Sequence, residues 1–477
     1  MFRQPRFGRY TAENTADGPL GPGWTHNYNV QFSKLGHNVA IKDWKGTERV
    51  FIWEDNAWKG GANVHGSSTL SRDANGNFHW RLRHGTTYLF EDAHNFRLAS
   101  ITDRQGNTLT LNYDGNSRLT SAVDANGRAV SFVNDGNGRI TQMTDPLNRT
   151  SLYTYDPDGQ LTKVTDALGF KAAYRYAPGS PGRLQAVVNA RGNTNIVYTY
   201  DGAGKIIATT NALGHATLYS RDDVMGWVKV TRPKGNAHTN YYNEDRQVIL
   251  RADAAGTTWL FRDNQGRVTN RLDRLGYTNH YHYAEGSCTC QISGQLLKHE
   301  DPLGRVNLWS YETNFHFKTA FTNAAGHVWR WAYDHRGNLT HETNALLGVT
   351  TMQYDAAGNR TNLIDALNRT TRFAFDQYGN RTNVTDALGH RTTFEYDLIG
   401  RLTRRVDALG RATSLAYDGR DRLVKQVDPL GRTNSWAYDG NGNRTAHTNE
   451  LGHVTHYAYD NATNSSPSPC PAAAVRS

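Results

Sequence analysis

The stretch DALGHRTTFEYDLIGRLTRRV, from Asp386 to Val406, decides the fold of this chain because it recurs along most of its length. Its first four residues return as Asp-Ala-Leu-Gly at Asp407, Asp-Pro-Leu-Gly at Asp428 and Asn-Glu-Leu-Gly at Asn449, each step being 21 residues. Related tetrads begin further upstream at Asp103, Asp124, Asp145, Asp166, Asn189, Asn211, Arg232, Asp253, Asp273, Asp301, Asn323, Asn344 and Asp365. These seventeen starts lie 20 to 23 residues apart, except for one step of 28 after Asp273. Such a period predicts a repeat array that grows as one continuous body.

Each unit reads as a β-hairpin. Phe394 and Tyr396 lie two residues apart with Glu395 between them, and this alternation places both rings on one face of a strand. The Tyr-Asp-x-x-Gly that follows predicts a turn, because Asp can bond the backbone and Gly can take a positive φ. A second short strand rich in Thr and Val completes the unit. The predicted fold class is all-β: tandem β-hairpin repeats of about 21 residues in a curled or spiralling sheet strip with a buried aromatic face.

The same residues carry a family resemblance. Tyr396-Asp397, Gly400-Arg401 and Leu402-Thr403 reproduce the signature Tyr-Asp-x-x-Gly-Arg-Leu-Thr, and the chain therefore resembles the RHS/YD-repeat family. The residues that we assign to this structural signature are Tyr354, Asp355, Gly358, Tyr396, Asp397, Gly400, Arg401, Tyr417, Asp418, Tyr438 and Asp439 at the Tyr-Asp turns, with Asp386, Gly389, Asp407 and Gly410 at the Asp-Ala-Leu-Gly turns.

The resemblance implies a function. In this family, which includes bacterial RHS repeat proteins, toxin-complex C components, wall-associated proteins and teneurins, the strip winds into a hollow, cocoon-like shell. In secreted and toxin-complex members the shell encloses a variable C-terminal effector. We expect a non-enzymatic shell or scaffold that encapsulates or displays a C-terminal effector of the polymorphic-toxin type, secreted or at the cell surface. The alternative is an extracellular carbohydrate-binding or cell-surface adhesion module.

Four regions follow from the pattern. Residues 1–28 contain the segment Gly18-Pro-Leu-Gly-Pro-Gly-Trp24, which resembles the segment preceding the array in bacterial members. Residues 29–100 predict irregular β-strands, and residues 101–460 form the array. The repeat is lost after Asp460, so we expect residues 461–477 to be a disordered tail produced by truncation or a frameshift. No apolar stretch resembles a signal peptide or a membrane span.

Two sets of residues are candidate sites. His280, His282, Cys288 and Cys290 combine zinc-ligand chemistry within eleven residues, although a thiol pair or an inert hairpin insertion explains the same stretch. Trp331 and Trp436 carry rings that stack on sugars in the adhesion alternative.

The remaining expectations are negative. No nucleophile elbow, metalloprotease helix, P-loop or dinucleotide fingerprint occurs in a credible context, so no catalytic residue and no cofactor are predicted. The net charge of +9 arises from Lys, Arg, Asp and Glu spread along the whole chain. We therefore expect no nucleic-acid partner.

Overall fold

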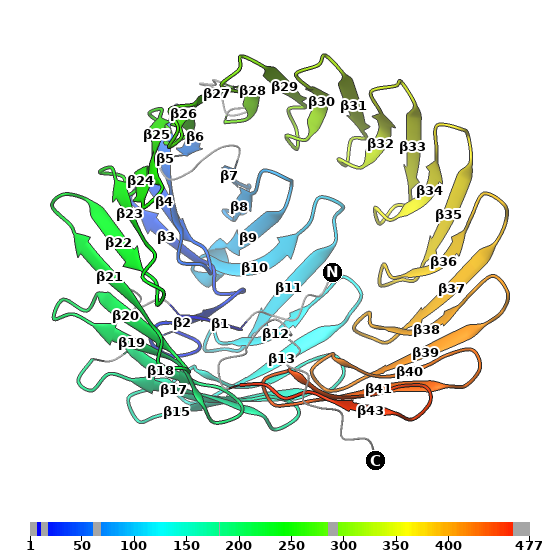
Figure 1. Ribbon diagram of the computed structural model, residues 1–477, viewed down its shortest axis with the longest axis horizontal. Helices are drawn as coiled ribbons and strands as arrows, with labels where there is room; N and C mark the ends of the chain where they lie inside the picture. Colours follow the sequence, from blue (N-terminus) through cyan, green and yellow to red (C-terminus); the bar gives the residue numbers. More distant parts are fainter. Residues whose placement is uncertain (1–6, 11–17, 61–67, 181, 285–293, 461–477) are drawn as a thin grey trace. The chain divides into compact units, whose positions relative to one another are not determined.

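The computed structural model describes residues 7–10, 18–60, 68–180, 182–284 and 294–460 (Figure 1). The chain divides into two compact units. Unit 1 comprises residues 1–27, 111–216 and 371–477, and unit 2 comprises residues 28–110 and 217–370. Cys288, Cys290 and the tail of residues 461–477, with its predicted disorder, lie outside the described residues.

The secondary structure is almost purely β. The first strands are β1 (Phe7–Tyr10), β2 (Trp24–His26), β3 (Gln31–Leu35), β4 (Asn38–Lys42), β5 (Glu48–Glu54), β6 (Ala57–Gly60), β7 (Thr69–Arg72), β8 (Phe78–Arg81), β9 (Thr87–Glu91) and β10 (Arg97–Thr102). A short 3-10 helix, η1 (Asp92–His94), precedes β10. Among the residues described, no helix has the length and hydrophobicity needed to cross a bilayer.

The array continues with strands of more uniform length, mostly five or six residues. The strands of its first half are β11 (Thr108–Tyr113), β12 (Leu119–Val123), β13 (Ala129–Asn134), β14 (Ile140–Thr144), β15 (Thr150–Tyr155), β16 (Leu161–Thr165), β17 (Lys171–Tyr176), β18 (Leu184–Val188), β19 (Thr194–Tyr200), β20 (Ile206–Asn211), β21 (Ala216–Asp222), β22 (Trp227–Thr231), β23 (Ala237–Tyr242), β24 (Val248–Asp253), β25 (Gly256–Arg262), β26 (Val268–Leu272) and β27 (Thr278–Tyr283). Those of its second half are β28 (Leu296–Glu300), β29 (Val306–Tyr311), β30 (Lys318–Thr322), β31 (Val328–Tyr333), β32 (Leu339–Thr343), β33 (Val349–Tyr354), β34 (Arg360–Ile364), β35 (Thr370–Phe375), β36 (Arg381–Thr385), β37 (Arg391–Tyr396), β38 (Leu402–Val406), β39 (Ala412–Tyr417), β40 (Leu423–Val427), β41 (Thr433–Tyr438), β42 (Arg444–Thr448) and β43 (Val454–His456).

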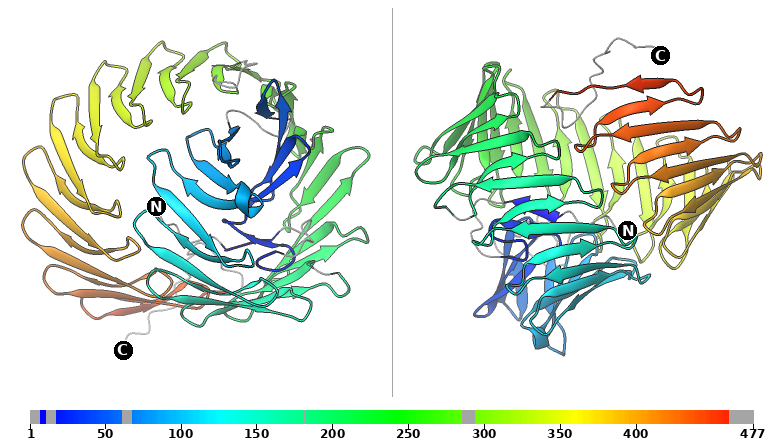
Figure 2. Two further views of the ribbon diagram at one scale, coloured as in Figure 1. Left: turned by 180° about the vertical axis from the view of Figure 1, so that it is seen from behind. Right: turned by 90° about the horizontal axis from the view of Figure 1, so that it is seen from below.

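Strands that follow one another in the chain pair antiparallel, as β37, β38, β39 and β40 do (Figure 2). Each 21-residue unit contributes two strands and two turns, one at each edge of the strip. The predicted all-β class of tandem hairpins is confirmed.

A β-bulge explains the Leu-Thr part of the signature. Between β37 and β38, Tyr396 pairs with Leu402 but Glu395 pairs with Arg404, so Thr403 is an extra residue in the ladder. The Thr403 hydroxyl donates to the Glu395 carbonyl at 3.1 Å. The same register shift occurs between β39 and β40 and between β41 and β42. Because a bulge increases local twist, it adds twist in each repeat where it occurs, although β21 and β22 pair without it.

The signature tyrosine ties neighbouring strands together. The Tyr417 hydroxyl, at the end of β39, donates to the Leu402 carbonyl at the start of β38, with 2.9 Å between the oxygens. The same bond, to a carbonyl 15 residues earlier, is made by Tyr155, Tyr176, Tyr283, Tyr311, Tyr333, Tyr354, Tyr396 and Tyr438. A phenol can therefore lie among apolar neighbours with its polar atom satisfied.

The alternation predicts correctly which face of each strand carries the rings, but that face is only half-buried. In β37, Phe394 and Tyr396 are half-buried, whereas Arg391 and Glu395 are exposed. Most of the fully buried apolar side chains lie between Leu20 and Val188. In the later strands the cover comes from neighbours in the same sheet, such as the Arg381 guanidinium, which lies 5.6 Å from the Phe394 ring centre.

Removing one tyrosine hydroxyl tests this tie. We expect Tyr417→Phe to lower the free energy of unfolding by about 1 kcal/mol, because the hydrogen bond to Leu402 is lost while the ring remains. Tyr277→Phe is the matched control, since Tyr277 is 53% exposed and its hydroxyl has no partner among the described residues. Equal urea midpoints for the two variants would contradict the role assigned to the signature tyrosine.

Candidate functional site

A side-chain oxygen closes most turns of the strip, from an Asp carboxylate at the majority and from an Asn amide at others, such as Asn344 and Asn449. At Asp397, Oδ1 accepts the backbone N–H groups of Ile399 at 3.2 Å and Arg401 at 2.9 Å, and Oδ2 accepts Arg401 Nε at 2.6 Å. The Gly400 N–H donates to the Asp397 carbonyl at 2.9 Å, and Gly400 has a φ of 86°. The turn thus needs a short acceptor at its first position and a left-handed residue at its fourth.

The Asp-Ala-Leu-Gly turns at the other edge are built in the same way. Asp407 Oδ1 accepts the N–H groups of Leu409 and Arg411 at 3.0 Å each, and Oδ2 accepts Arg411 Nε at 2.7 Å. At Asp386 the fifth residue is His390, whose Nδ1 lies 2.9 Å from Oδ2. The two sequence motifs therefore encode variants of one five-residue turn, most often Asp-x-x-Gly-Arg, at the two ends of the hairpins.

These hydrogen bonds favour the charged carboxylates. The backbone N–H of Arg411 lowers the pKa of Asp407, and its guanidinium adds to the effect. At Asp418, burial alone would raise the pKa, but the backbone N–H groups of Arg422 and Arg420 and the Arg422 guanidinium outweigh it, so the pKa is lowered. The ionised forms of Asp407 and Asp418 are thus the ones that the fold favours.

The turn arginines link one 21-residue repeat to the next. Arg401 Nη1 donates to the Asp418 carbonyl at 3.2 Å, and its guanidinium lies 5.1 Å from the Tyr417 ring centre. Arg422 repeats both contacts one unit later, with the Asp439 carbonyl at 3.0 Å and the Tyr438 ring at 4.7 Å. The Tyr-Asp edge is therefore a ladder in which each Arg serves its own turn and the following one.

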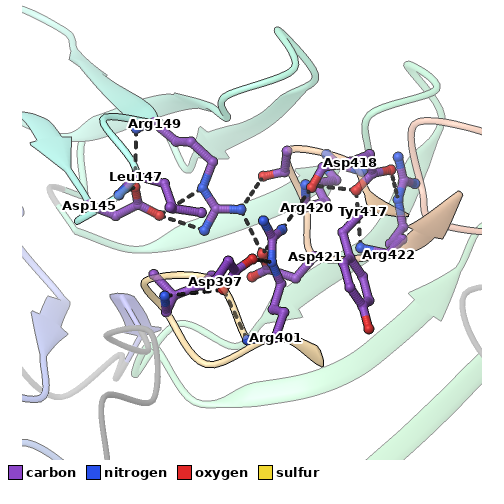
Figure 3. A network of polar contacts seen from close by, with 12 residues as sticks. Asp145, Leu147, Arg149, Asp397, Arg401, Tyr417, Asp418, Arg420, Asp421 and Arg422 are labelled. Atoms are coloured by element: carbon purple, nitrogen blue, oxygen red, sulfur yellow. Dashed lines mark hydrogen bonds and ion pairs between the residues drawn. The ribbon is translucent and has the colours of Figure 1, made fainter. Parts of the chain in front are cut away.

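In unit 1 two lengths of the strip meet at their edges. We call the strands of residues 111–216 the earlier pass and those of residues 371–460 the later pass. Arg149 of the earlier pass donates from Nη1 to the Gly419 carbonyl at 3.2 Å and to Asp421 Oδ1 at 2.6 Å (Figure 3). Asp421 Oδ1 also accepts Arg401 Nη1 at 2.8 Å. One carboxylate thus joins two guanidiniums from residues more than 250 positions apart.

Asp421 departs from the repeat at this point. It stands where other units have Gly, and it takes the left-handed φ of 63° that the turn requires. Asp tolerates this conformation better than most residues with a side chain. Its ion pairs with Arg149 and Arg401 give a physical reason for the departure.

Arginine side chains from each edge reach into the turns of the other edge. Arg128 of the earlier pass lies 4.9 Å from the ring centre of Tyr378 and donates to the Leu398 carbonyl at 3.3 Å, so it touches two consecutive Tyr-Asp turns. The Arg420 guanidinium of the later pass bonds both Asp166 and the Gly440 carbonyl. A Cβ on Gly419 would lie 2.9 Å from Leu168 Cδ2, which explains a glycine there.

Unit 2 contains the same kind of contact. Gln105 Nε2 donates to Asn338 Oδ1 at 3.2 Å, and a Cβ on Gly358 would lie 2.5 Å from Gln105 Cγ. The Phe315 carbonyl accepts His84 Nδ1 at 3.0 Å. In each unit, turns of the Asp-Ala-Leu-Gly edge fit against turns of the Tyr-Asp edge from a distant part of the chain. We call each of these contacts a seam.

The seam changes the environment of an otherwise constant turn. The side chains of Arg149 and Asp145 are 14% and 7% exposed, whereas those of Arg411 and Asp407, at the corresponding edge of the later pass, are 60% and 23% exposed. Leu388, Leu409, Leu430 and Leu451 on this second edge are all more than 70% exposed. The same motif therefore serves as a covered joint in one pass and an uncovered edge in the other.

The proline-containing N-terminal motif packs against the earlier pass in unit 1. The Pro19 carbonyl accepts the Ile140 N–H at 2.8 Å, and Trp24 Nε1 donates to the Tyr176 hydroxyl at 2.7 Å. Beside them, His26 is fully buried, and burial lowers its pKa to about 4. Sequence reasoning recognised the motif by resemblance but had no signal for these partners.

The candidate metal ligands are only partly described. His280 Nδ1 lies 2.9 Å from Asn270 Oδ1, and His282 is exposed on the same strand, β27. Cys288 and Cys290 lie outside the described residues. Within the described ranges, no group of three or more His, Cys, Asp or Glu side chains could hold a metal ion. The zinc site stays a prediction.

The two candidate sugar-stacking tryptophans are both half-buried and occupied by neighbours. Trp331 Nε1 donates to Glu342 Oε1 at 3.3 Å. The Trp436 ring stacks on His447, with 5.5 Å between the ring centres and 9° between the planes. Glycan stacking at these positions stays a prediction.

These features define a class of protein: a tandem β-hairpin repeat scaffold whose turns, arginine ladders and seams hold neighbouring strands and passes together. The RHS Repeat family model matches residues 92–129, 135–171, 182–216, 200–237, 319–347, 337–370, 354–392, 375–405, 396–433 and 438–465, which together exceed half of the chain. The chain belongs to the RHS-repeat family.

Solved structures that resemble the chain are distant. They include a crystal structure of TcdB2-TccC3-TEV, with a TM-score of 0.42 and 12% identity over 90% of this chain and 25% of that chain. Another is a Photorhabdus luminescens Tc holotoxin pore with a mutation in TccC3, with a TM-score of 0.41 and 11% identity over 89% and 29% of the two chains. The chain thus spans between a quarter and a third of the length of these structures. No curated protein matches it.

Breaking the seam of unit 1 should cost more than breaking the same turn at an uncovered edge. We expect Arg149→Gln to lower the free energy of unfolding by about 2 kcal/mol, because Asp145 and Asp421 lose a charged donor in a partly buried site. Arg411→Gln is the matched control and should have little effect, since its pair with Asp407 is solvated. Urea unfolding measures both. A control as damaging as the seam variant would contradict the special role of the covered joint.

The turn carboxylates whose pKa is lowered, Asp407 and Asp418 among them, predict acid sensitivity. A carboxyl whose pKa is lower in the folded chain stabilises the fold above its ordinary pKa, 3.8 for Asp, and that stability is lost as the pH falls through the folded value. We expect the urea midpoint to be level near neutral pH and to fall steeply below about pH 4. Asp418→Asn should reduce the steepness. A midpoint that is independent of pH down to pH 2 would refute the assignment.

Proposed function

We propose that the chain is part of the wall of an RHS shell that encloses or displays a C-terminal effector, and that it has no catalytic activity of its own. The observation that carries the proposal is the seam of unit 1. There the Asp-Ala-Leu-Gly turns of one pass interlock with the Tyr-Asp turns of another pass about 270 residues later. A strip that joins itself edge to edge makes a wall wider than one strip.

The hydrogen bonding within the strip supports the same function. Its turns, ladders and bulges are satisfied by groups within the strip, and the recurring carboxylates are bound to backbone N–H groups and arginines at their own turns. A carboxylate held in this way is a poor general base, because its oxygen lone pairs are already occupied by hydrogen bonds. Membership of the RHS-repeat family supports an effector partner and a secreted or cell-surface location, as the family resemblance implied.

The first test is to sequence the DNA that follows the codon for Ser477 and to translate it in all reading frames. We expect further RHS units, a segment that ends the array and then an unrelated terminal domain. In the longer product, that domain should resist a protease that digests it when it is expressed alone. A stop codon retained in related genomes with nothing RHS-like beyond it, or a terminal domain that is digested equally fast in both forms, would overturn the effector assignment.

A further inference from the structure

One turn of unit 2 reverses the charge of the repeat. Where most other repeats begin this turn with Asp, several of them as Asp-x-Leu-Gly, the turn after β22 reads Arg232-Pro-Lys-Gly-Asn236. The backbone bonds of the turn are kept: the Arg232 N–H donates to the Asn236 carbonyl at 2.9 Å, and the Gly235 N–H donates to the Arg232 carbonyl at 2.8 Å. The turn therefore forms without its carboxylate, and it has cationic side chains in place of the usual Asp and Leu.

A cavity of about 680 Å³ lies beside this turn, between it and the next turn along the same edge. Lys229, Arg232 and Arg251 line it together with one carboxylate, Asp253. Asp253 is 3.7 Å from Arg274 Nη1. Within the described part of the chain, Lys229, Arg232 and Arg251 form no ion pair. The lining thus has an excess of positive charge, in contrast to the Arg-Asp pairs of the ordinary turns.

One ring nitrogen of a histidine in the same cavity also has no partner among the described residues. His238, on β23, lines the cavity, and its buried Nδ1 has no hydrogen-bond partner in the described structure. Burial lowers the pKa of His238, and the charges of Arg251 and Arg232 lower it further. A buried ring nitrogen without a partner costs free energy unless a ligand or water satisfies it.

We propose that this cavity binds an oxyanion group, a phosphate, sulfate or carboxylate, between the guanidiniums of Arg232 and Arg251, with the unpartnered Nδ1 of His238 as a further hydrogen-bonding group. Guanidinium presents paired donors that match the oxygens of such groups, and two of them with Lys229 supply the charge to hold a dianion. The site is separate from the seams and adds a ligand-binding function to the scaffold.

Isothermal titration calorimetry of the full chain with inorganic phosphate, sulfate and acetate, at constant ionic strength in chloride, tests the proposal. We expect saturable binding of at least one of the three, and the strongest binder identifies the preferred oxyanion. Arg232→Asp should weaken that binding about tenfold or more, because a charge-assisted bond is replaced by repulsion. This variant should fold, since Asp is the usual residue at this turn position.

Two further variants keep the test decisive. Arg330→Asp makes the same change in charge at an exposed position of β31, outside the cavity, and should bind like the unaltered chain. Arg251→Gln, which introduces the residue found at the corresponding position before Asp428, should also weaken binding. The proposal is overturned if none of the three anions binds saturably, or if Arg330→Asp weakens binding as much as Arg232→Asp, because the effect would then be general attraction to a basic protein.

Discussion

The hydrogen bonds between a turn carboxylate and the backbone N–H groups two and four residues later set the geometry from which the other contacts of the strip follow. At Asp397 these bonds turn the chain back on itself, and Gly400 supplies the left-handed conformation that closes the turn. The remaining carboxylate oxygen recruits Arg401, which reaches the next unit. Strand pairing, the arginine ladder and the edges that meet at the seams all begin with this local bond.

Repetition makes the scaffold modular, and the departures from it are informative. A repeat array draws its stability from each unit and from the contacts between neighbours, so no single hydrophobic core is required. This agrees with a face that is only half-buried in the later strands. Against such regularity, Asp421 replaces a glycine where it can pair with Arg149, and Arg232 replaces a turn aspartate beside a cavity. One departure strengthens a joint, and the other creates unpaired positive charge.

The seam shows how one motif can have two energetic roles. The Arg149–Asp145 pair is withdrawn from water and bonded to a second pass, whereas the Arg411–Asp407 pair is solvated. Breaking a desolvated pair leaves a charge without its hydration, while a solvated pair exchanges its partner for water at little cost. In unit 1 the loss of one partner is therefore expected to cost more where the passes join, although the sequences of the turns are nearly the same.

Local sequence determined the hairpins, both turn types, the face that carries the rings and the family, because these features rest on bonds within about 15 residues, such as that from Tyr417 to Leu402. It did not reveal that the two turn motifs share one construction, nor the bulge at Thr403. Only the tertiary structure decided that Arg149 meets Asp421 and that Trp24 reaches Tyr176. Such contacts depend on the twist accumulated over many units, and the sequence of one unit does not contain that sum.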